Sequence, residues 1–475
     1  MLTQKGQSFI EILVAMGVFV MVSTAGFFLF FGGQSLIVDS ANSQLALDYA
    51  SEGIEAARSI RDRSWGNLAD GDHGLVYNEE DEQWQFSGTE DNKEMFTRIV
   101  TISTVDANTK KIVSRITWQI TPARTQSLQL TEELGNWVEL SQSSCKVSSL
   151  AGDWTQPLSI GSGDLGPGNE GTDVLIKGNY AYIGGTAASA AKPDLFVFDI
   201  SVPASPELVK SVNIGAGGIN SLFIKGDYLY AASPNNAQEL IIFDITTPSN
   251  PTSVGSYNLS GDTDAIAVVA FGDTAAIGRE SGASYQLAFI NVAVPSSPSI
   301  IDEVFVGGSV KDFAETGDKL FAMVSNGSGG DVWIYDIGDS ADPVQLSIYD
   351  IPSMSDGRSV YLYYKGNSQY LLVGNGEQEL VLIGATTTSN MYVRDRVNVG
   401  GAVNDIVCVA SNWAFIGTDN SIKEFIIVNV NDPDNIFEQA SLNYPQVASG
   451  IDFYNNNVFM AVRSNDSLRT ITSTP

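Results

Sequence analysis

Histidine, cysteine and basic residues are scarce in this 475-residue chain. Its one histidine is His73, so the part after residue 150 has none, which excludes a histidine-dependent base or nucleophile there. Lys and Arg number 25 against 55 Asp and Glu, a formal net charge of -30. Because such a surface repels phosphates and anionic lipid heads, we expect no nucleic-acid partner for the C-terminal part.

The two cysteines, Cys145 and Cys408, lie far apart in the sequence. Two residues form no disulfide framework and have no metal-ligand spacing. A bridge between them is compatible with an exported protein, but the sequence favours two unrelated thiols. His73 has no companion ligands nearby, which indicates an exposed loop histidine and no metal site.

A long uncharged segment stands near the start of the chain, from about residue 12 to residue 31. Roughly twenty residues at about 1.5 Å each give a helix about 30 Å long, the thickness of a bilayer core. The lone carboxylate Glu11 at its edge is costly unless something pairs with it. Lys5 is the one basic residue before the segment, so we expect the short end in the cytoplasm and the remainder outside.

The residues around Glu11 read K-G-Q-S-F-I-E, from Lys5 onwards. This order resembles the class III leader of type IV pilins and pseudopilins. The resemblance covers about the first 60 residues and implies that a prepilin peptidase removes residues 1–6 by cutting after Gly6. It also implies methylation of the new terminus and a Glu11 that neutralises a neighbouring subunit's terminal amine in a filament. The family usually has Phe where this chain has Gln7, which leaves methylation open, and a plain single-pass anchor with an incidental Glu11 is the alternative.

Apolar residues then recur at threes and fours, which predicts one helix over 7–63 with a membrane span at about 12–31. Short alternating segments over 64–140 predict strands at 75–77, 84–86, 96–105 and 111–120, the last two as a hairpin. A small antiparallel sheet on a long helix is similar to a pilin head. A linker rich in Ser and Gly follows at 141–153.

From residue 172 the chain repeats at about 45 residues. Each marker is an apolar segment that ends in an acid or amide, at Asp199, Asp244, Asn291, Asp336 and Asn429. Four short strands per unit predict a seven-bladed β-propeller over 154–475, so the whole fold is α+β followed by all-β. The seventh unit ends after three strands, and the spare segment 154–161 is predicted to supply its fourth and so close the ring.

The markers resemble LVIVD repeats, known mostly from bacterial and archaeal surface proteins, a resemblance that covers about 300 residues and says little about activity. Their recurring acids suit turns that cap the third strand better than catalysis. Residues near the starts of the inner strands are predicted to ring one mouth of the channel: Asp173, Asn220, Asp264, Asp312 and Asp405. Such a ring suits hydrated acids, with calcium or a polar ligand as the alternative.

These features together predict a minor type IV pilin-like subunit that displays a propeller for adhesion or for binding a protein or glycan. It would sit in the cytoplasmic membrane before assembly, then on the pilus or cell surface, with other pilin subunits as partners. We expect no catalytic residues and no cofactor. The alternative is a pseudopilin of a type II secretion-like or DNA-uptake assembly with the propeller as scaffold; a propeller hydrolase is less favoured.

Overall fold

The computed structural model describes most of the chain, in two compact units, Met1–Leu140 and Ser141–Pro475. The described residues are 9–63, 67–78, 83–106, 109–121, 124–135, 146, 150–187, 189–215, 217–325, 330–366, 368–410 and 412–474.

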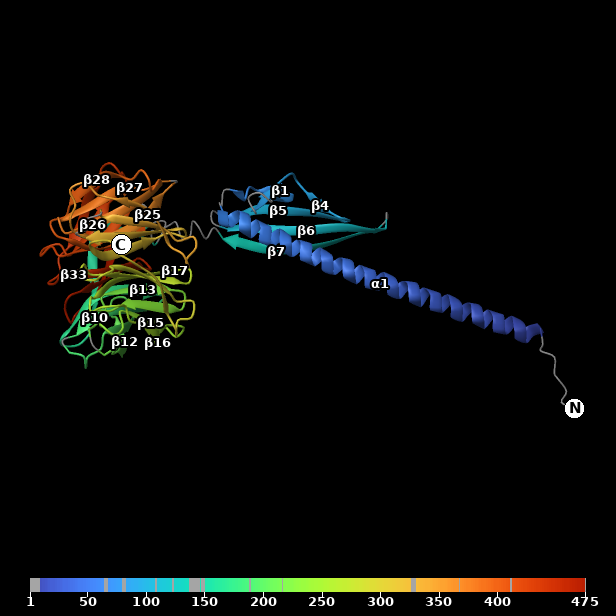
Figure 1. Cartoon of the computed structure of the whole chain (residues 1–475), viewed down its shortest axis with the longest axis horizontal. Helices are drawn as coiled ribbons and strands as arrows, with labels where there is room; N and C mark the ends of the chain where they lie inside the picture. Colours follow the sequence, from blue (N-terminus) through green and yellow to red (C-terminus); the bar gives the residue numbers. More distant parts are fainter. Residues whose placement is uncertain are drawn as a thin grey trace. The chain divides into compact units, whose positions relative to one another are not determined.

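The first unit is built on the helix α1 (Phe9–Arg63), whose C-terminal half lies along a sheet in Figure 1. Ala46, Ala50, Ile54 and Ala57 are buried at spacings of three and four, so they form the stripe that faces the sheet. The helix ends where the sequence predicted.

Across the described residues, no helix combines the length and apolarity that a bilayer crossing requires, so the structure gives the predicted membrane span no support. Side chains of that span are described for Met16 to Thr24 alone. Gly6 and Gln7 lie outside the described residues, as does the side chain of Glu11.

The sheet of the first unit has the order β1-β5-β6-β7, with β4 also paired to β5, and β2 and β3 form a separate hairpin. The strands are β1 (Gly71–His73), β2 (Leu75–Asn78), β3 (Gln83–Phe86), β4 (Asp91–Lys93), β5 (Phe96–Asp106), β6 (Thr109–Thr121) and β7 (Arg124–Gly135). The sequence predicted β2, β3, β5 and β6 and the β5–β6 hairpin, but not the other three. The predicted loop position of His73 is wrong, since it lies in β1 with its ring centroid 4.6 Å from that of Phe86.

The described part of the second unit consists of seven four-stranded antiparallel sheets, the blades of a β-propeller (Figure 1). Blade 1 consists of β9 (Asn169–Lys177), β10 (Tyr180–Ala187), β11 (Leu195–Asp199) and β12 (Glu207–Val212). Blade 2 consists of β13 (Ser221–Lys225), β14 (Tyr228–Ala232), β15 (Leu240–Asp244) and β16 (Thr252–Tyr257). Blade 3 consists of β17 (Ala265–Phe271), β18 (Thr274–Arg279), β19 (Leu287–Asn291) and β20 (Ser299–Val304). Blade 4 consists of β21 (Ser309–Glu315), β22 (Lys319–Ser325), β23 (Val332–Asp336) and β24 (Val344–Tyr349). Blade 5 consists of β25 (Gly357–Lys365), β26 (Ser368–Asn375), β27 (Glu379–Gly384) and β28 (Tyr392–Asn398). Blade 6 consists of β29 (Val403–Ala410), β30 (Trp413–Thr418), β31 (Phe425–Asn429) and β32 (Phe437–Leu442). Blade 7 consists of β33 (Ala448–Tyr454), β34 (Asn457–Val462), β35 (Leu468–Thr474) and β8 (Asp153–Gly163).

Blade 7 takes its outer strand from the beginning of the domain, because β8 pairs with β35. The segment that the sequence assigned to this place was 154–161, within β8. The inner strand of each blade contacts the inner strands of its neighbours, and β33 contacts β9, so the ring is continuous. Apolar side chains of the middle strands fill the spaces between blades; Phe196, Phe243, Phe289 and Phe415 are all nearly inaccessible to solvent.

The recurring acid or amide at the end of the third strand makes an Asx turn, as predicted. The Oδ1 atom of Asp199 accepts a hydrogen bond from the N–H of Ser201 at 2.8 Å. The same bond, two residues along the chain, forms at Asp244, Asn291, Asp336 and Asn429. These residues are therefore structural.

A second periodic contact was not predicted. The residue just before the third strand accepts the N–H of the residue 20 positions later, which follows the fourth strand. The acceptors are Asp194, Glu239, Gln286, Asp331 and Glu424, and the donors are Ile214, Leu259, Val306, Ile351 and Tyr444. Each acceptor is buried, so the contact gives a buried polar side chain a partner at the end of every one of these blades.

Candidate functional site

The inner strands begin around a polar cavity of about 510 Å³ at one mouth of the central channel. All seven blades contribute to its wall, as does the loop before β25, which carries Asp356. Its lining residues are Thr172, Asp173, Asn220, Ser221, Ile266, Glu280, Lys311, Asp312, Asp356, Arg358, Asn404, Asp405, Ser449 and Arg463. We call this cavity the channel mouth.

Four of the five residues that the sequence placed at the channel mouth do line it: Asp173, Asn220, Asp312 and Asp405. Asp264 does not line the cavity, although it lies beside it, where its carbonyl accepts the N–H of Glu280 at 3.2 Å. Ile266 lines the wall at that blade instead, so blade 3 presents an apolar side chain where other blades present polar ones.

The acids of the channel mouth hold neighbouring blades together. The Oδ2 atom of Asp173 accepts the N–H of Leu222 in blade 2 at 2.7 Å, while its Oδ1 accepts the N–H of Val174. Asp312 makes the same pair of bonds with Val360 and Phe313, as does Asp405 with Ile451 and Ile406. Each carboxylate therefore accepts two backbone amides, one from its own blade and one from the next.

Neutral side chains make matching links between blades. Five of them donate a hydrogen bond to a backbone carbonyl. The pairs of donor and acceptor are Thr172 and Ile219, Asn220 and Ala265, Ser359 and Val403, Asn404 and Ala448, and Ser449 and Gly171. Deeper in the channel, Asp452 of blade 7 accepts the N–H of Ile176 in blade 1 at 2.8 Å, at the point where the ring closes. Polar residues along the inner strands thus satisfy backbone groups that a channel would leave exposed.

Confinement in the channel perturbs the three acids. Burial raises the pKa of Asp173 to about 6 and that of Asp312 to about 7, although the backbone N–H bonds act in the opposite direction. Burial, together with the charges of Asp173 and Asp312, raises the pKa of Asp405 well above its usual value. Protons are therefore bound here at a pH where exposed carboxyls have lost theirs.

Sequence reasoning missed the charged residues that share the cavity with these acids. Arg358 donates through Nε to Asp356 at 3.1 Å and through Nη1 to Asn404 at 3.2 Å, and the Nζ of Lys311 lies 3.8 Å from Glu280. Lys311 directly precedes Asp312, so its closeness to the predicted ring was a usable signal. The channel mouth therefore presents both signs of charge, which suits a ligand that carries both or neither.

The channel also holds Lys146, from the segment that the sequence described as a linker. Its backbone N–H donates to the carbonyl of Cys408 at 2.9 Å, and its Nζ lies 2.8 Å from Oδ1 of Asp452. Burial by itself would lower the pKa of this ammonium, but the nearby charge of Asp452 more than compensates and raises it. Lys146 thus pairs with an acid that is almost inaccessible to solvent.

Cys408 is disulfide-bonded. The sequence holds one other cysteine, Cys145, which lies outside the described residues. The prediction of two unrelated thiols is therefore wrong; sequence distance carried no information because the ring returns β29 to the place where the domain begins.

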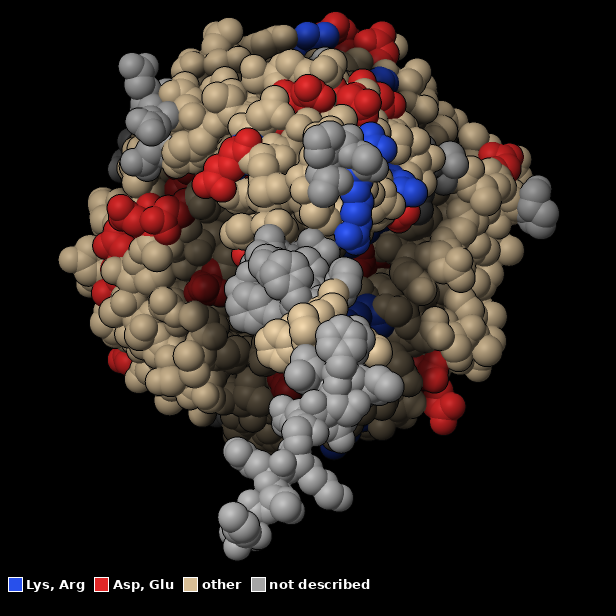
Figure 2. All heavy atoms as spheres, turned by 90° about the vertical axis from the view of Figure 1, so that its right-hand side faces the viewer, with Lys and Arg blue, Asp and Glu red and all other residues tan. Residues whose placement is uncertain are grey.

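Acidic side chains are spread around the face that Figure 2 shows and do not gather in one patch, while basic ones are fewer. The described residues include no group of three or more His, Cys, Asp or Glu side chains arranged to hold a metal ion.

Comparison with known proteins agrees with the fold. The model of the LVIVD repeat matches residues 169–214 and 216–259, which are blades 1 and 2. No curated protein matches the chain.

Solved structures that resemble the chain include a catalytically inactive virginiamycin B lyase from Staphylococcus aureus with quinupristin. It is 11% identical, with a TM-score of 0.50 over 67% of this chain and 99% of that one. A protein from Lactobacillus plantarum is 10% identical, with a TM-score of 0.49 over 57% of this chain and 85% of that one. YCF48 bound to D1 peptide is 11% identical, with a TM-score of 0.47 over 69% and 100%. Likeness to the lyase at 11% identity speaks for the fold alone and not for an activity. The chain therefore carries a β-propeller domain, of which two blades match the LVIVD repeat.

Proposed function

We propose that the chain is a surface-displayed binding subunit whose propeller recognises a protein or glycan with the end that carries the channel mouth. The observation that supports this most is the channel mouth itself, a polar cavity of about 510 Å³ with both signs of charge. Its acids are held in backbone hydrogen bonds and so suit a rigid recognition surface better than proton transfer. We therefore propose binding and not catalysis.

We further propose that α1 assembles the chain beside other pilin-like subunits, as a minor component of a filament. In support, large apolar side chains near its beginning are exposed, among them Phe19 at 72% and Met21 at 70%. Exposed apolar surface of this kind calls for a covering partner, either lipid or neighbouring helices. In this proposal, prepilin peptidase cuts between Gly6 and Gln7 and Glu11 meets the new amine of a neighbour.

The assembly proposal is tested by mass spectrometry of the native chain and by imaging with an antibody to the propeller. We expect a mature N-terminus at Gln7 and label along or at the tip of filaments. Met1 to Gly6 found still attached would overturn the filament role and leave a propeller on a simple anchor. Mature chain confined to the inner membrane would favour the pseudopilin alternative.

The binding proposal is tested by measuring how particles coated with the full chain adhere to cells and polymers from its natural surroundings. Arg358→Glu inverts a charge inside the channel mouth and is expected to reduce adhesion about tenfold. Arg394→Glu is the matched control, because Arg394 also pairs with an acid, Asp434, but does not line the mouth. Equal adhesion of the two variants would show that the channel mouth is not the binding surface.

A further inference from the structure

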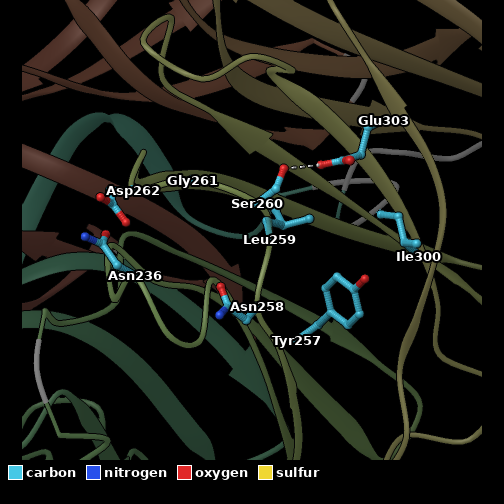
Figure 3. Close-up of a pocket in the computed structure, with 9 residues that line it drawn as sticks. All are labelled: Asn236, Tyr257, Asn258, Leu259, Ser260, Gly261, Asp262, Ile300 and Glu303. Atoms are coloured by element: carbon cyan, nitrogen blue, oxygen red, sulfur yellow. Dashed lines mark hydrogen bonds between the residues drawn. The ribbon is translucent and has the colours of Figure 1, made fainter.

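A second polar cavity lies where blade 2 meets blade 3. Its volume is about 410 Å³, within the range of roughly 300–1,000 Å³ that small-molecule sites occupy. It is lined by Asn236, Tyr257, Asn258, Leu259, Ser260, Gly261, Asp262, Ile300 and Glu303, all drawn in Figure 3. We call it the blade 2–3 groove.

The groove opens at the same end of the propeller as the channel mouth. In blade 2 the strand pairs place Ser221 beside Ala232, Ala232 beside Leu240 and Leu240 beside Tyr257. The start of the inner strand, the β14–β15 loop that carries Asn236 and the end of β16 therefore share one edge of the blade. A ligand that approaches this end meets both cavities.

Two buried charged residues fix the loop that forms the groove. This loop, residues 258–264 between β16 and β17, is called the groove loop. The Oε2 atom of Glu239 accepts the N–H of Leu259 at 2.9 Å, and Nη2 of Arg279 donates to the carbonyl of Ser260 at 2.9 Å. The Nε of Arg279 donates to the carbonyl of Thr263 at 3.2 Å. Glu239 and Arg279 are 0% and 1% exposed, so this loop is held from beneath. A site fixed in advance loses less entropy when it binds.

At the position where blade 3 has Arg279, the strand pairs place an uncharged residue in every other blade. These residues are all buried: Gly185, Ser233, Val324, Asn375, Thr418 and Val462. Burying a guanidinium is expensive unless its donors are satisfied, and here the acceptors are the backbone carbonyls of the groove loop. The exception in blade 3 thus coincides with the groove.

The lining combines apolar and hydrogen-bonding surfaces. In Figure 3, Tyr257 and Ile300 stand at one end of the groove and Asn236 and Asp262 at the other, while Ser260 donates to Glu303 at 3.3 Å. Amide and carboxylate groups can bind pairs of adjacent hydroxyls, and an aromatic ring can pack on a face of C–H groups. The lining has two acids and no Lys or Arg, so it disfavours phosphate, sulfate and carboxylate ligands.

We propose that the blade 2–3 groove is a binding site for an uncharged sugar, with Tyr257 as the platform for its C–H face and Asp262, Asn236 and Glu303 as partners for its hydroxyls. It rests on the proposed function, because it names the ligand class that a displayed binding domain would recognise. It adds a second site to the channel mouth on the same end of the propeller.

The test is titration calorimetry and saturation-transfer NMR of the full chain with methyl glycosides of glucose, galactose, mannose and N-acetylglucosamine. Sialic acid serves as the charged counterpart. We expect at least one neutral glycoside to bind and sialic acid not to bind. Tyr257→Ala should weaken that binding about tenfold or more and Asp262→Ala by a similar factor, whereas Tyr257→Phe should retain most of it.

The control is Tyr454→Ala, which removes a tyrosine outside the groove, 39% exposed, and should leave binding unchanged. No binding of any neutral glycoside, or binding that Tyr257→Ala and Asp262→Ala leave unchanged, would overturn the proposal. So would tighter binding of a lysine-rich peptide in the groove. If the wild-type chain adheres but binds no neutral glycoside, the groove proposal is overturned and the proposed function stands. If the wild-type chain binds a neutral glycoside but does not adhere, the proposed function is overturned and the groove stands.

Discussion

Two opposing influences act on the pKa of Asp312. It is buried in a channel among other acids, which raises the pKa, but its carboxylate accepts two backbone N–H bonds, which lower the pKa. Burial raises its pKa to about 7 in the folded chain, above the ordinary value of 3.8. The folded state therefore binds more protons than the unfolded state between these values. Stability contributed by this group is highest below pH 4 and is lost as the pH rises towards 7.

We predict that the wild-type propeller has a lower free energy of unfolding at pH 7.5 than at pH 5, and that Asp312→Asn reduces this difference. Urea unfolding at the two pH values measures it. Asp336→Asn is the control, because it changes an exposed acid outside the channel, in an Asx turn. A pH dependence equal in both variants would contradict a role for Asp312.

Glu424 shows what the buried acceptors before the third strands require. It is 3% exposed, and its Oε2 accepts the N–H of Tyr444 at 2.6 Å. Gln286 fills the same position in blade 3 with an amide oxygen, so the position needs an acceptor and not a charge.

We therefore predict that Glu424→Ala costs about 1–3 kcal/mol because it leaves a buried N–H without a partner. Glu424→Gln should retain most of the stability. Chemical unfolding of the full chain, followed by tryptophan fluorescence, compares the two. Equal losses in both variants would mean that the carboxylate charge, and not the acceptor, is what the position requires.

At the scale of elements, the sequence predicted those features that depend on local pattern. The helix end at Arg63, the β5–β6 hairpin and the Asx turns at Asp199 and its equivalents all follow from periodicity or turn chemistry. Strand β7 was missed, because its polar residues alternate with few large apolar ones. The acceptors spaced 20 residues from their donors share the 45-residue period and were visible in the sequence, but their role depends on which end of the blade each strand reaches.

What the sequence could not predict depends on the closing of the ring. The bond from Asp173 to Leu222 spans 49 residues, and that from Asp452 to Ile176 spans 276. Nothing local to either residue specifies its partner. The same holds for the groove loop, where Arg279 contacts a carbonyl 19 residues away.

The contact between α1 and β6 depends on one glycine. A Cβ atom at Gly53 would lie 2.3 Å from Oγ of Ser114, which is fully buried. Alanine would improve helix propensity by about 1 kcal/mol, but the overpacking costs about 1–3 kcal/mol.

We predict that Gly53→Ala lowers the melting temperature of the first unit and that adding Ser114→Ala restores part of it. Gly17→Ala is the control, because a Cβ there meets nothing within 4 Å. Differential scanning calorimetry of the full chain reads the transition, and a double-mutant cycle gives the coupling. Independent effects at the two positions would show that the helix and sheet adjust without strain.

At the scale of the whole molecule, the two ends of the propeller meet in blade 7. β35 lies between β34 and β8, so it joins the C-terminal strands of blade 7 to the strand from the beginning of the domain. Without it, β8 has no partner in its blade and β34 becomes an exposed edge, which is open to pairing with other chains. Trp154 on β8, 3% exposed, would lose its contact with Phe453, whose ring centroid lies 6.1 Å away.

We predict that a chain ending at Val462, which lacks β35, loses the cooperative unfolding transition of the propeller while the first unit keeps its own. A chain ending at Thr474 is the control and should unfold like the full chain, because it retains every strand. Thr470→Pro tests the same point without shortening the chain, since proline cannot donate to the ladder that Thr470 forms between Gly161 and Phe459. Calorimetry and light scattering record the transitions and any association. If the chain ending at Val462 remained monomeric with one cooperative propeller transition, the blades would be stable as an open array, and closure would not be what holds the ring together.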